Sequence, residues 1–177
     1  VWRDWLSRYV QTRYGNVTNT KVSEAWLLLA RSIYGWPADN VSQGCRESVF
    51  CARPSLDAKW VSSWAETVDY YEPDSVIRAA KLMVEAAADM PANANFRYDL
   101  VDITRQAVAE RARLVYNEIV AAYKANDRKM FRHTTQRFLR LLLQQDRLLS
   151  SVPDFMLGRW IKQARSLATT QAEADHY

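Results

Sequence analysis

The feature that most constrains this chain is a pair of long helical patterns with almost nothing between them. Residues 98–124 and residues 127–150 both carry apolar side chains at helical spacing, and Asn126 and Asp127 mark the break. Two long helices joined by so short a turn are expected to lie antiparallel against each other. The sequence therefore predicts a helical hairpin within a bundle.

Turn-forming residues are too scarce for a sheet-rich fold. Four Gly and five Pro in 177 residues leave few sites for the tight hairpins of a sheet-rich protein. A chain of this length is also large enough to bury a core of its own. We therefore predict an all-α fold, an irregular helical bundle of about six or seven helices with one long loop, forming a single domain over residues 1–177.

The remaining helices are expected to be shorter and bounded by Gly, Pro or a capping residue. The stretch 35–55 has no sustained period, and loops of that length are typical of functional or interfacial segments. We expect the other helices at residues 1–14, 20–34 and 56–70, from Pro73 to a turn at 90–95, and at 154–169.

Membrane and export signals are not expected in this stretch. It contains no run of about 18 apolar residues, the length needed to span a bilayer. Arg3, Asp4 and Arg8 near its start do not fit the apolar region of a signal peptide.

Positive charge is concentrated in the second half, where residues 90–177 carry 14 Lys and Arg against nine Asp and Glu. In the predicted helix 127–150 the basic residues share one face. That face is explained most simply by solvation, and the alternative is an acidic polymer as partner. The excess is modest for nucleic acid, which we do not expect as a partner. The residues of this face are Lys129, Arg132, Arg140 and Arg147.

Seven Trp and nine Tyr make the chain rich in the flat side chains that pack against sugar rings. Trp5, Trp26 and Trp160 stand in apolar helical patterns, so we expect them in the core. The better candidates for a surface or cleft lie at the ends of elements: Trp36, Tyr70, Tyr71 and Tyr98.

No catalytic residue is predicted in the chain. Glycoside hydrolysis needs two carboxylates flanking one bond, and Asp99 and Asp102 are close enough in sequence to be considered. We expect instead that both favour the start of a helix and that Asp102 pairs with Arg105 one turn on. A second acidic cluster is expected to serve as a helix junction with capping roles, and comprises Asp69, Glu72 and Asp74.

Metal ions and cofactors are not expected either, because the chain has no paired-cysteine, His-Glu-x-x-His or Gly-rich phosphate motif. Its two histidines, His133 and His176, lie far from the two cysteines. Cys45 and Cys51 are separated by five residues in a predicted loop. This spacing is compatible with either a small disulfide or two free thiols. A disulfide would imply an oxidising compartment.

Three stretches of the chain carry a more specific signal. Residues 96–108 read FRYDLVDITRQAV, residues 25–34 read AWLLLARSIY, and residues 155–165 read FMLGRWIKQAR, with AEADHY at 172–177. Together they resemble the C-terminal domain of α-N-acetylglucosaminidases, glycoside hydrolase family 89. The resemblance spans nearly the whole chain.

This resemblance implies a role without chemistry of its own. Members of the family remove terminal α-linked N-acetylglucosamine with retention, using two glutamates on an upstream (β/α)₈ barrel. The chain would then be a non-catalytic helical domain that packs on this barrel and helps to complete the sugar pocket. By the same resemblance, the parent enzyme would be secreted, periplasmic or lysosomal.

The family pattern also continues past the position of Tyr177, so the resemblance implies that the chain is a fragment of the domain and that its final helices are missing. An exposed apolar seam, with possible self-association through it, is then expected. The alternative hypothesis is a free-standing interaction module that binds an acidic polymer through the basic face of helix 127–150.

Two loop-flanking groups are the candidates for the pocket or the barrel interface. One is Arg53 with Ser55, and the other is Arg97, Tyr98 and Asp99. Arginine beside hydrogen-bonding neighbours suits either sugar hydroxyls or the carboxylates of an adjoining domain. A purely local role, in which Arg97 and Asp99 fix the helix entry, is an equal alternative.

Overall fold

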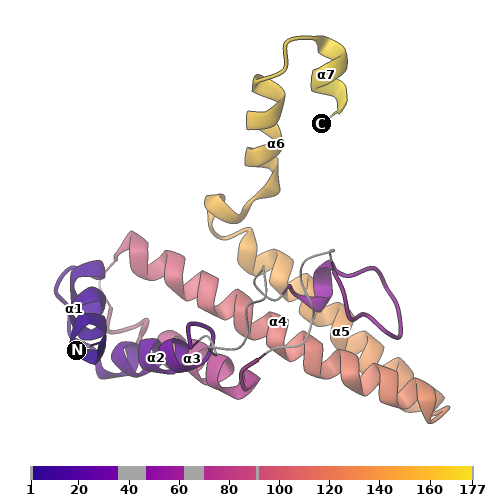
Figure 1. Cartoon of the computed structure of the whole chain (residues 1–177), viewed down its shortest axis with the longest axis horizontal. Helices are drawn as coiled ribbons and strands as arrows, with labels where there is room; N and C mark the ends of the chain where they lie inside the picture. Colours follow the sequence, from indigo (N-terminus) through magenta and orange to yellow (C-terminus); the bar gives the residue numbers. More distant parts are fainter. Residues whose placement is uncertain (1, 36–46, 62–69, 91, 177) are drawn as a thin grey trace.

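The chain forms an all-α structure, as predicted. The computed structural model describes residues 2–35, 47–61, 70–90 and 92–176. Within these ranges lie seven α-helices and two short 3-10 helices (Figure 1). They are α1 (Trp2–Arg13), α2 (Thr20–Arg31), η1 (Val49–Cys51), α3 (Pro73–Ala86), α4 (Ala94–Lys124), α5 (Arg128–Leu149), η2 (Pro153–Phe155), α6 (Leu157–Ser166) and α7 (Gln171–His176).

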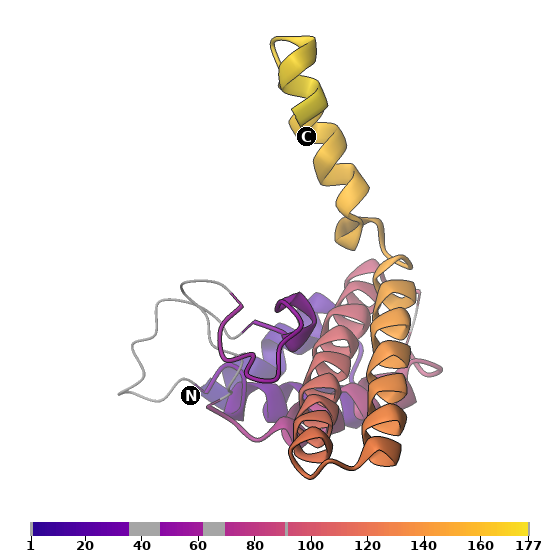
Figure 2. The ribbon, with the colours of Figure 1, turned by 90° about the vertical axis from the view of Figure 1, so that its right-hand side faces the viewer.

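The predicted helical hairpin is formed by α4 and α5, which lie side by side and antiparallel (Figures 1 and 2). Asn126 makes the turn in a left-handed conformation, with φ of 53°. The side chain of Asp127 then caps α5 by accepting a hydrogen bond of 2.9 Å from the backbone N–H of Met130. The position of the break was therefore predicted correctly from these two residues.

The main core lies between α1, α2, α3 and the first half of α4. Tyr14, Val22, Val76 and Met83 are fully buried within it. Pro73 occupies the first turn of α3, where its missing N–H costs nothing. Glu72 takes the N-cap position, but its side chain makes no capping hydrogen bond, so that part of the junction prediction was wrong; Asp69 lies outside the described residues.

A second, smaller cluster forms where η1 and the segment after it lie on the middle of the hairpin. The rings of Phe50 and Phe138 pack with their centroids 5.3 Å apart. The helix predicted at 56–70 is wrong over 56–61, because this stretch is irregular and Ala58 donates its backbone N–H to the hydroxyl of Tyr116 on α4. Residues 62–69 of that prediction, and residues 36–46 of the predicted loop, lie outside the described residues.

The last part of the chain projects from the body as an arm made of α6 and α7 (Figure 2). The single helix predicted over 154–169 is interrupted, because η2 ends at Phe155 and Met156 adopts an extended backbone before α6 begins. None of the residues of α6 is buried. Trp160 and Trp5 are both exposed, so their predicted places in the core were wrong, whereas Trp26 is buried as predicted.

None of the helices in the described ranges has both the length and the apolar character needed to cross a membrane.

Candidate functional site

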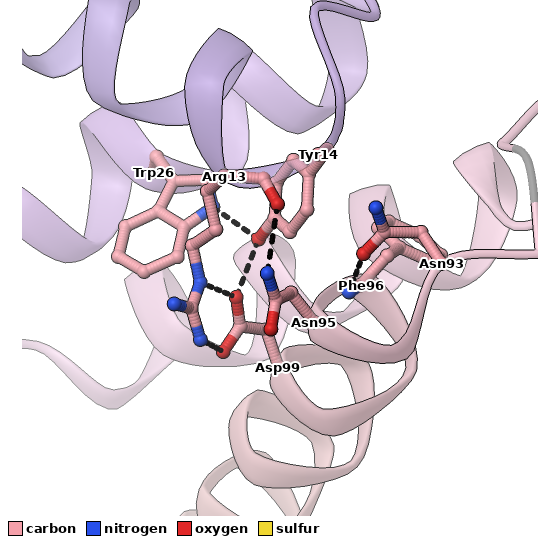
Figure 3. Close-up of polar contacts among 7 residues, drawn as sticks. All are labelled: Arg13, Tyr14, Trp26, Asn93, Asn95, Phe96 and Asp99. Atoms are coloured by element: carbon pink, nitrogen blue, oxygen red, sulfur yellow. Dashed lines mark hydrogen bonds and ion pairs between the residues drawn. The ribbon is translucent and has the colours of Figure 1, made fainter.

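A buried carboxylate joins three helices at the start of α4. Asp99 accepts two hydrogen bonds from the guanidinium of Arg13, one of them of 2.7 Å from Nη2, and a third of 2.8 Å from the hydroxyl of Tyr14 (Figure 3). That hydroxyl in turn accepts a bond of 2.8 Å from Nε1 of Trp26 on α2. The chain of contacts therefore holds α1, α2 and α4 together, and we call it the Asp99 network.

The residues just before Asp99 reinforce this junction. Asn93 caps α4 by accepting a hydrogen bond of 3.0 Å from the N–H of Phe96, and Asn95 donates one of 3.0 Å to the carbonyl of Arg13 (Figure 3). The ring of Phe96 meets the ring of Tyr14 edge to face at 5.5 Å. Because Asn93 is the cap, α4 begins at Ala94, one turn earlier than predicted, and Asp99 lies beyond the first turn.

The electrostatics of the network favour the ion pair. The hydrogen bond with Asp99 holds the pKa of Arg13 above its ordinary value. Burial, followed by the negative charge of Asp99, raises the pKa of Tyr14. The donors around the carboxylate are thus kept protonated, and their three hydrogen bonds occupy most of its roughly four acceptor positions. Asp99 is therefore engaged within its own domain as a buried ion pair, which is a structural role.

Asp102 is also paired, as predicted: its carboxylate accepts from Arg105 one turn later, with the closest atoms 2.6 Å apart. Arg105 lies in addition over the ring of Phe155, 5.7 Å from its centroid. Tyr98 stacks on the same ring at 5.0 Å and 23°. Tyr98, Arg105 and Phe155 thus form a contact between α4 and the base of the arm, which we call the aromatic joint.

The predicted site residues do not converge on one place. Arg97 and Tyr98 are exposed at the start of α4, whereas Asp99 is buried beside them. Arg53 and Ser55 are exposed at the middle of the hairpin, where the carbonyl of Ser55 accepts a bond of 3.1 Å from Tyr116. Tyr98 and Tyr116 are 18 residues apart on one helix, which separates the two groups by about 27 Å.

Arg53 and Ser55 line a groove of about 510 Å³ between the η1 segment and the hairpin. Most of its walls are apolar, and Phe138 and Leu142 of α5 form one side. The basic face of α5 lies elsewhere, with Lys129 and Arg132 exposed to solvent as expected for a solvated surface.

The partners of these residues were not predicted from the sequence. Nothing in local spacing connects Arg13 with Asp99, because 86 positions separate them. A second buried acid was also missed: Glu110 accepts hydrogen bonds of 2.6 Å from Tyr71 and 2.8 Å from Gln106. Tyr71, predicted as a surface candidate, is therefore half-buried and engaged within the domain.

The described residues offer no group of three or more His, Cys, Asp or Glu side chains that could hold a metal ion. Cys51 is a free, exposed thiol, and Cys45 lies outside the described residues, as does Trp36. What the geometry provides is a rigid junction, an aromatic joint and an exposed arm.

Comparison with known families decides what kind of domain this is. The family of the α-N-acetylglucosaminidase (NAGLU) C-terminal domain matches residues 5–177. The chain belongs to this family. Human α-N-acetylglucosaminidase is 35% identical to it over 174 residues, which cover 98% of this chain and 22% of the human protein.

Solved structures of family 89 glycoside hydrolases have the same fold as this C-terminal domain. The enzyme from Clostridium perfringens in complex with 2-acetamido-1,2-dideoxynojirmycin superposes with a TM-score of 0.91 at 29% identity, over 99% of this chain and 20% of the enzyme. The same enzyme with two glutamates changed to glutamine, in complex with its substrate GlcNAc-α-1,4-galactose, gives 0.90. The domain thus spans about a fifth of the length of the relatives that it matches.

Proposed function

We propose that this domain works within a family 89 α-N-acetylglucosaminidase, where it packs on the catalytic barrel and helps to complete the pocket for terminal α-linked N-acetylglucosamine. The observation that carries the proposal is the unequal coverage. The comparisons cover at least 98% of this chain but only 20–22% of each enzyme. A domain that recurs in this way is one part of a larger catalytic protein, and the chemistry belongs to another part.

The state of the carboxylates supports a non-catalytic role. Retaining glycosidases place two carboxyl groups about 5–5.5 Å apart across the bond that they cleave. Here Asp99 is buried and accepts hydrogen bonds from Arg13 and Tyr14, and Asp102 is paired with Arg105. Both carboxylates therefore have structural partners within the domain, which supports a non-catalytic role.

The two exposed groups are assigned different roles within this proposal. A single sugar ring is far smaller than the separation of about 27 Å between them, so they cannot line the same pocket. Arg97 has an exposed guanidinium that suits the hydroxyls of a sugar at the pocket edge, and Tyr98 beside it offers the part of its ring that Phe155 leaves exposed. Arg53 and Ser55 border an apolar groove, which suits the barrel interface better.

The first test compares the 177-residue chain with the same chain joined to its barrel. We expect p-nitrophenol release from p-nitrophenyl α-N-acetylglucosaminide in the longer polypeptide only. Equal turnover by the 177-residue chain would overturn the proposal and reopen the assignment of Asp99 and Asp102.

The pocket role is tested separately in the longer polypeptide. Arg97→Ala and Tyr98→Ala should raise KM, whereas Arg111→Ala, an exposed arginine further along α4, should leave it unchanged. Unfolding midpoints of all three variants identify any loss that is due to stability alone. Unchanged KM in both test variants would remove this group from the pocket.

A further inference from the structure

The arm carries an apolar face whose largest side chains are exposed in the described structure. At 100° per residue, the apolar side chains of α6 and its C-cap fall within an arc of about 120°. Leu157 is 70% exposed, Trp160 60% and Leu167 80%, whereas Ile161 and Ala164 are partly covered. Arg159, Lys162 and Ser166 occupy the opposite side. We call the apolar arc the α6 face; it comprises Leu157, Trp160, Ile161, Ala164 and Leu167.

Contacts with the body do not explain this pattern. In the described residues the arm is held at its base, where Phe155 contacts both Tyr98 and Arg105 in the aromatic joint. Beyond that point α6 leads away from the body, and α7 folds back beside it (Figures 1 and 2). An amphipathic helix of ten residues whose main contact is the six-residue α7 is marginal in water, because most helical stability comes from burying the apolar face.

The direction of the arm is nevertheless the same in a much longer protein. Residues 157–176 make up 20 of the 177 positions, so an arm pointing elsewhere would leave about a ninth of the chain unmatched. The TM-score of 0.91 over 99% of the chain leaves no room for such a mismatch. The matched enzyme is about five times longer than this chain, and its remaining polypeptide is available to hold the arm in place.

We propose that the α6 face is the surface through which this domain docks onto the remaining four fifths of the enzyme's own polypeptide. The inference rests on the proposed function, since it names the surface by which the domain joins the larger enzyme. Apolar surface of this kind is rarely left exposed on a soluble protein, and its arc matches the stripe that a helix buries against a partner. The aromatic joint holds the base of the arm while the face is covered.

The test is hydrogen exchange of the α6 backbone amides in the 177-residue chain and in the longer polypeptide. Two matched variants, Ala164→Glu and Ser166→Glu, each place one carboxylate on α6. Ala164 lies at the centre of the α6 face and Ser166 on the opposite side. Amides of α2 and α3 are followed in every sample to show that the body is folded.

We expect α6 exchange to slow at least tenfold in the longer polypeptide. Ala164→Glu should restore fast exchange there, and Ser166→Glu should leave it slow. Equal α6 exchange in the two proteins would overturn the proposal, as would equal effects of the two variants. Slower α6 exchange at higher concentrations of the 177-residue chain, equal in the parent and in both variants, would also overturn the proposal. It would indicate that a second copy of the chain covers the α6 face.

Hydrolysis of p-nitrophenyl α-N-acetylglucosaminide by the same samples separates the two proposals. If the longer polypeptide is active but its α6 amides exchange as fast as in the 177-residue chain, the proposed docking surface is wrong and the proposed function still stands. Protected α6 in an inactive longer polypeptide would support the docking surface and count against the proposed function.

Discussion

The helices of the body and the helix of the arm follow the same sequence pattern but have opposite surroundings. In α3 the apolar residues Val76, Ala79 and Met83 are fully buried against α2 and α4. In α6 an equally clear apolar arc contains no buried residue, and Leu157 and Trp160 are exposed. An amphipathic pattern thus predicts that a face will be buried without indicating whether the partner lies in the same stretch of chain.

The difference also separates two sources of stability. The body combines a hydrophobic core with the Asp99 network, and both are complete within the described residues. The arm has its own backbone hydrogen bonds and one stacked ring at its base. Substitutions in the body should therefore change the free energy of unfolding of the 177-residue chain, whereas substitutions on the arm should matter chiefly in the longer polypeptide.

The largest effect is expected at the centre of the body. Asp99→Ala should lower the free energy of unfolding by about 3 kcal/mol, because removing one partner of a buried pair leaves Arg13 and Tyr14 unsatisfied. Asp102→Ala, three residues away but half-exposed, should cost less than about 1 kcal/mol. Urea unfolding of both variants measures the difference. Equal losses would show that the Asp99 network contributes no more than a surface ion pair.

A comparison of core and arm tests the contrast directly. Met83→Ala should cost about 2–5 kcal/mol, because it leaves a cavity in a fully buried site. Leu157→Ala removes a similar apolar side chain from the α6 face and should change the stability of the 177-residue chain by less than about 0.5 kcal/mol. The same urea titrations apply. A large loss for Leu157→Ala would mean that the arm packs on the body in solution.

Alkaline pH should weaken the body through Tyr14. Its pKa is raised in the folded state, so this tyrosine keeps its proton when the unfolded chain releases it above a pKa of about 10. The stabilisation is present below pH 10 and is lost as the pH rises further, by up to about 1.4 kcal/mol at pH 11. Unfolding free energies at pH 9 and pH 11 provide the measurement. Tyr14→Phe should be less stable at both values but should show a smaller fall between them.

The smallest effect is expected from removing helix caps, one in the body and one in the arm. Asn93→Ala removes the cap of α4 and should cost about 1 kcal/mol of global stability. Thr170→Ala removes the hydroxyl that accepts the N–H of Glu173 at the start of α7, and should leave the global transition unchanged because the arm opens locally. Hydrogen exchange resolves the second case, where only α7 amides should exchange faster. A global loss for Thr170→Ala would show that arm and body unfold together.

The sequence allowed the architecture to be predicted because its signals are local. Asn126, Asp127 and Pro73 mark helix boundaries through backbone geometry and capping, and all three lie where the pattern predicts. The error at 56–61 has a tertiary cause, since the hydroxyl of Tyr116 accepts the N–H of Ala58, which a helix would have paired within the segment. Helical spacing alone could not reveal that competition.

The site was predicted less well, for a related reason. Asp99 was singled out by its motif, but its partner Arg13 lies on another helix and no pattern of spacing links them. Trp160 was assigned to the core because its helix is amphipathic, although its face is exposed in the described structure. In both cases the missing information was the identity of the neighbour rather than the character of the residue.

The aromatic joint gives the arm the geometry of a lever. The ten residues of α6 extend about 15 Å from Phe155, so a rotation of about 10° at the joint displaces the far end by roughly 2.6 Å. A shift of the Tyr98 ring too small to disturb α4 would thus become a movement as large as half a helical turn at the tip. Tyr98, the third residue of the FRYDLVDITRQAV segment, therefore sets the direction of a helix that begins nearly sixty residues further along the chain.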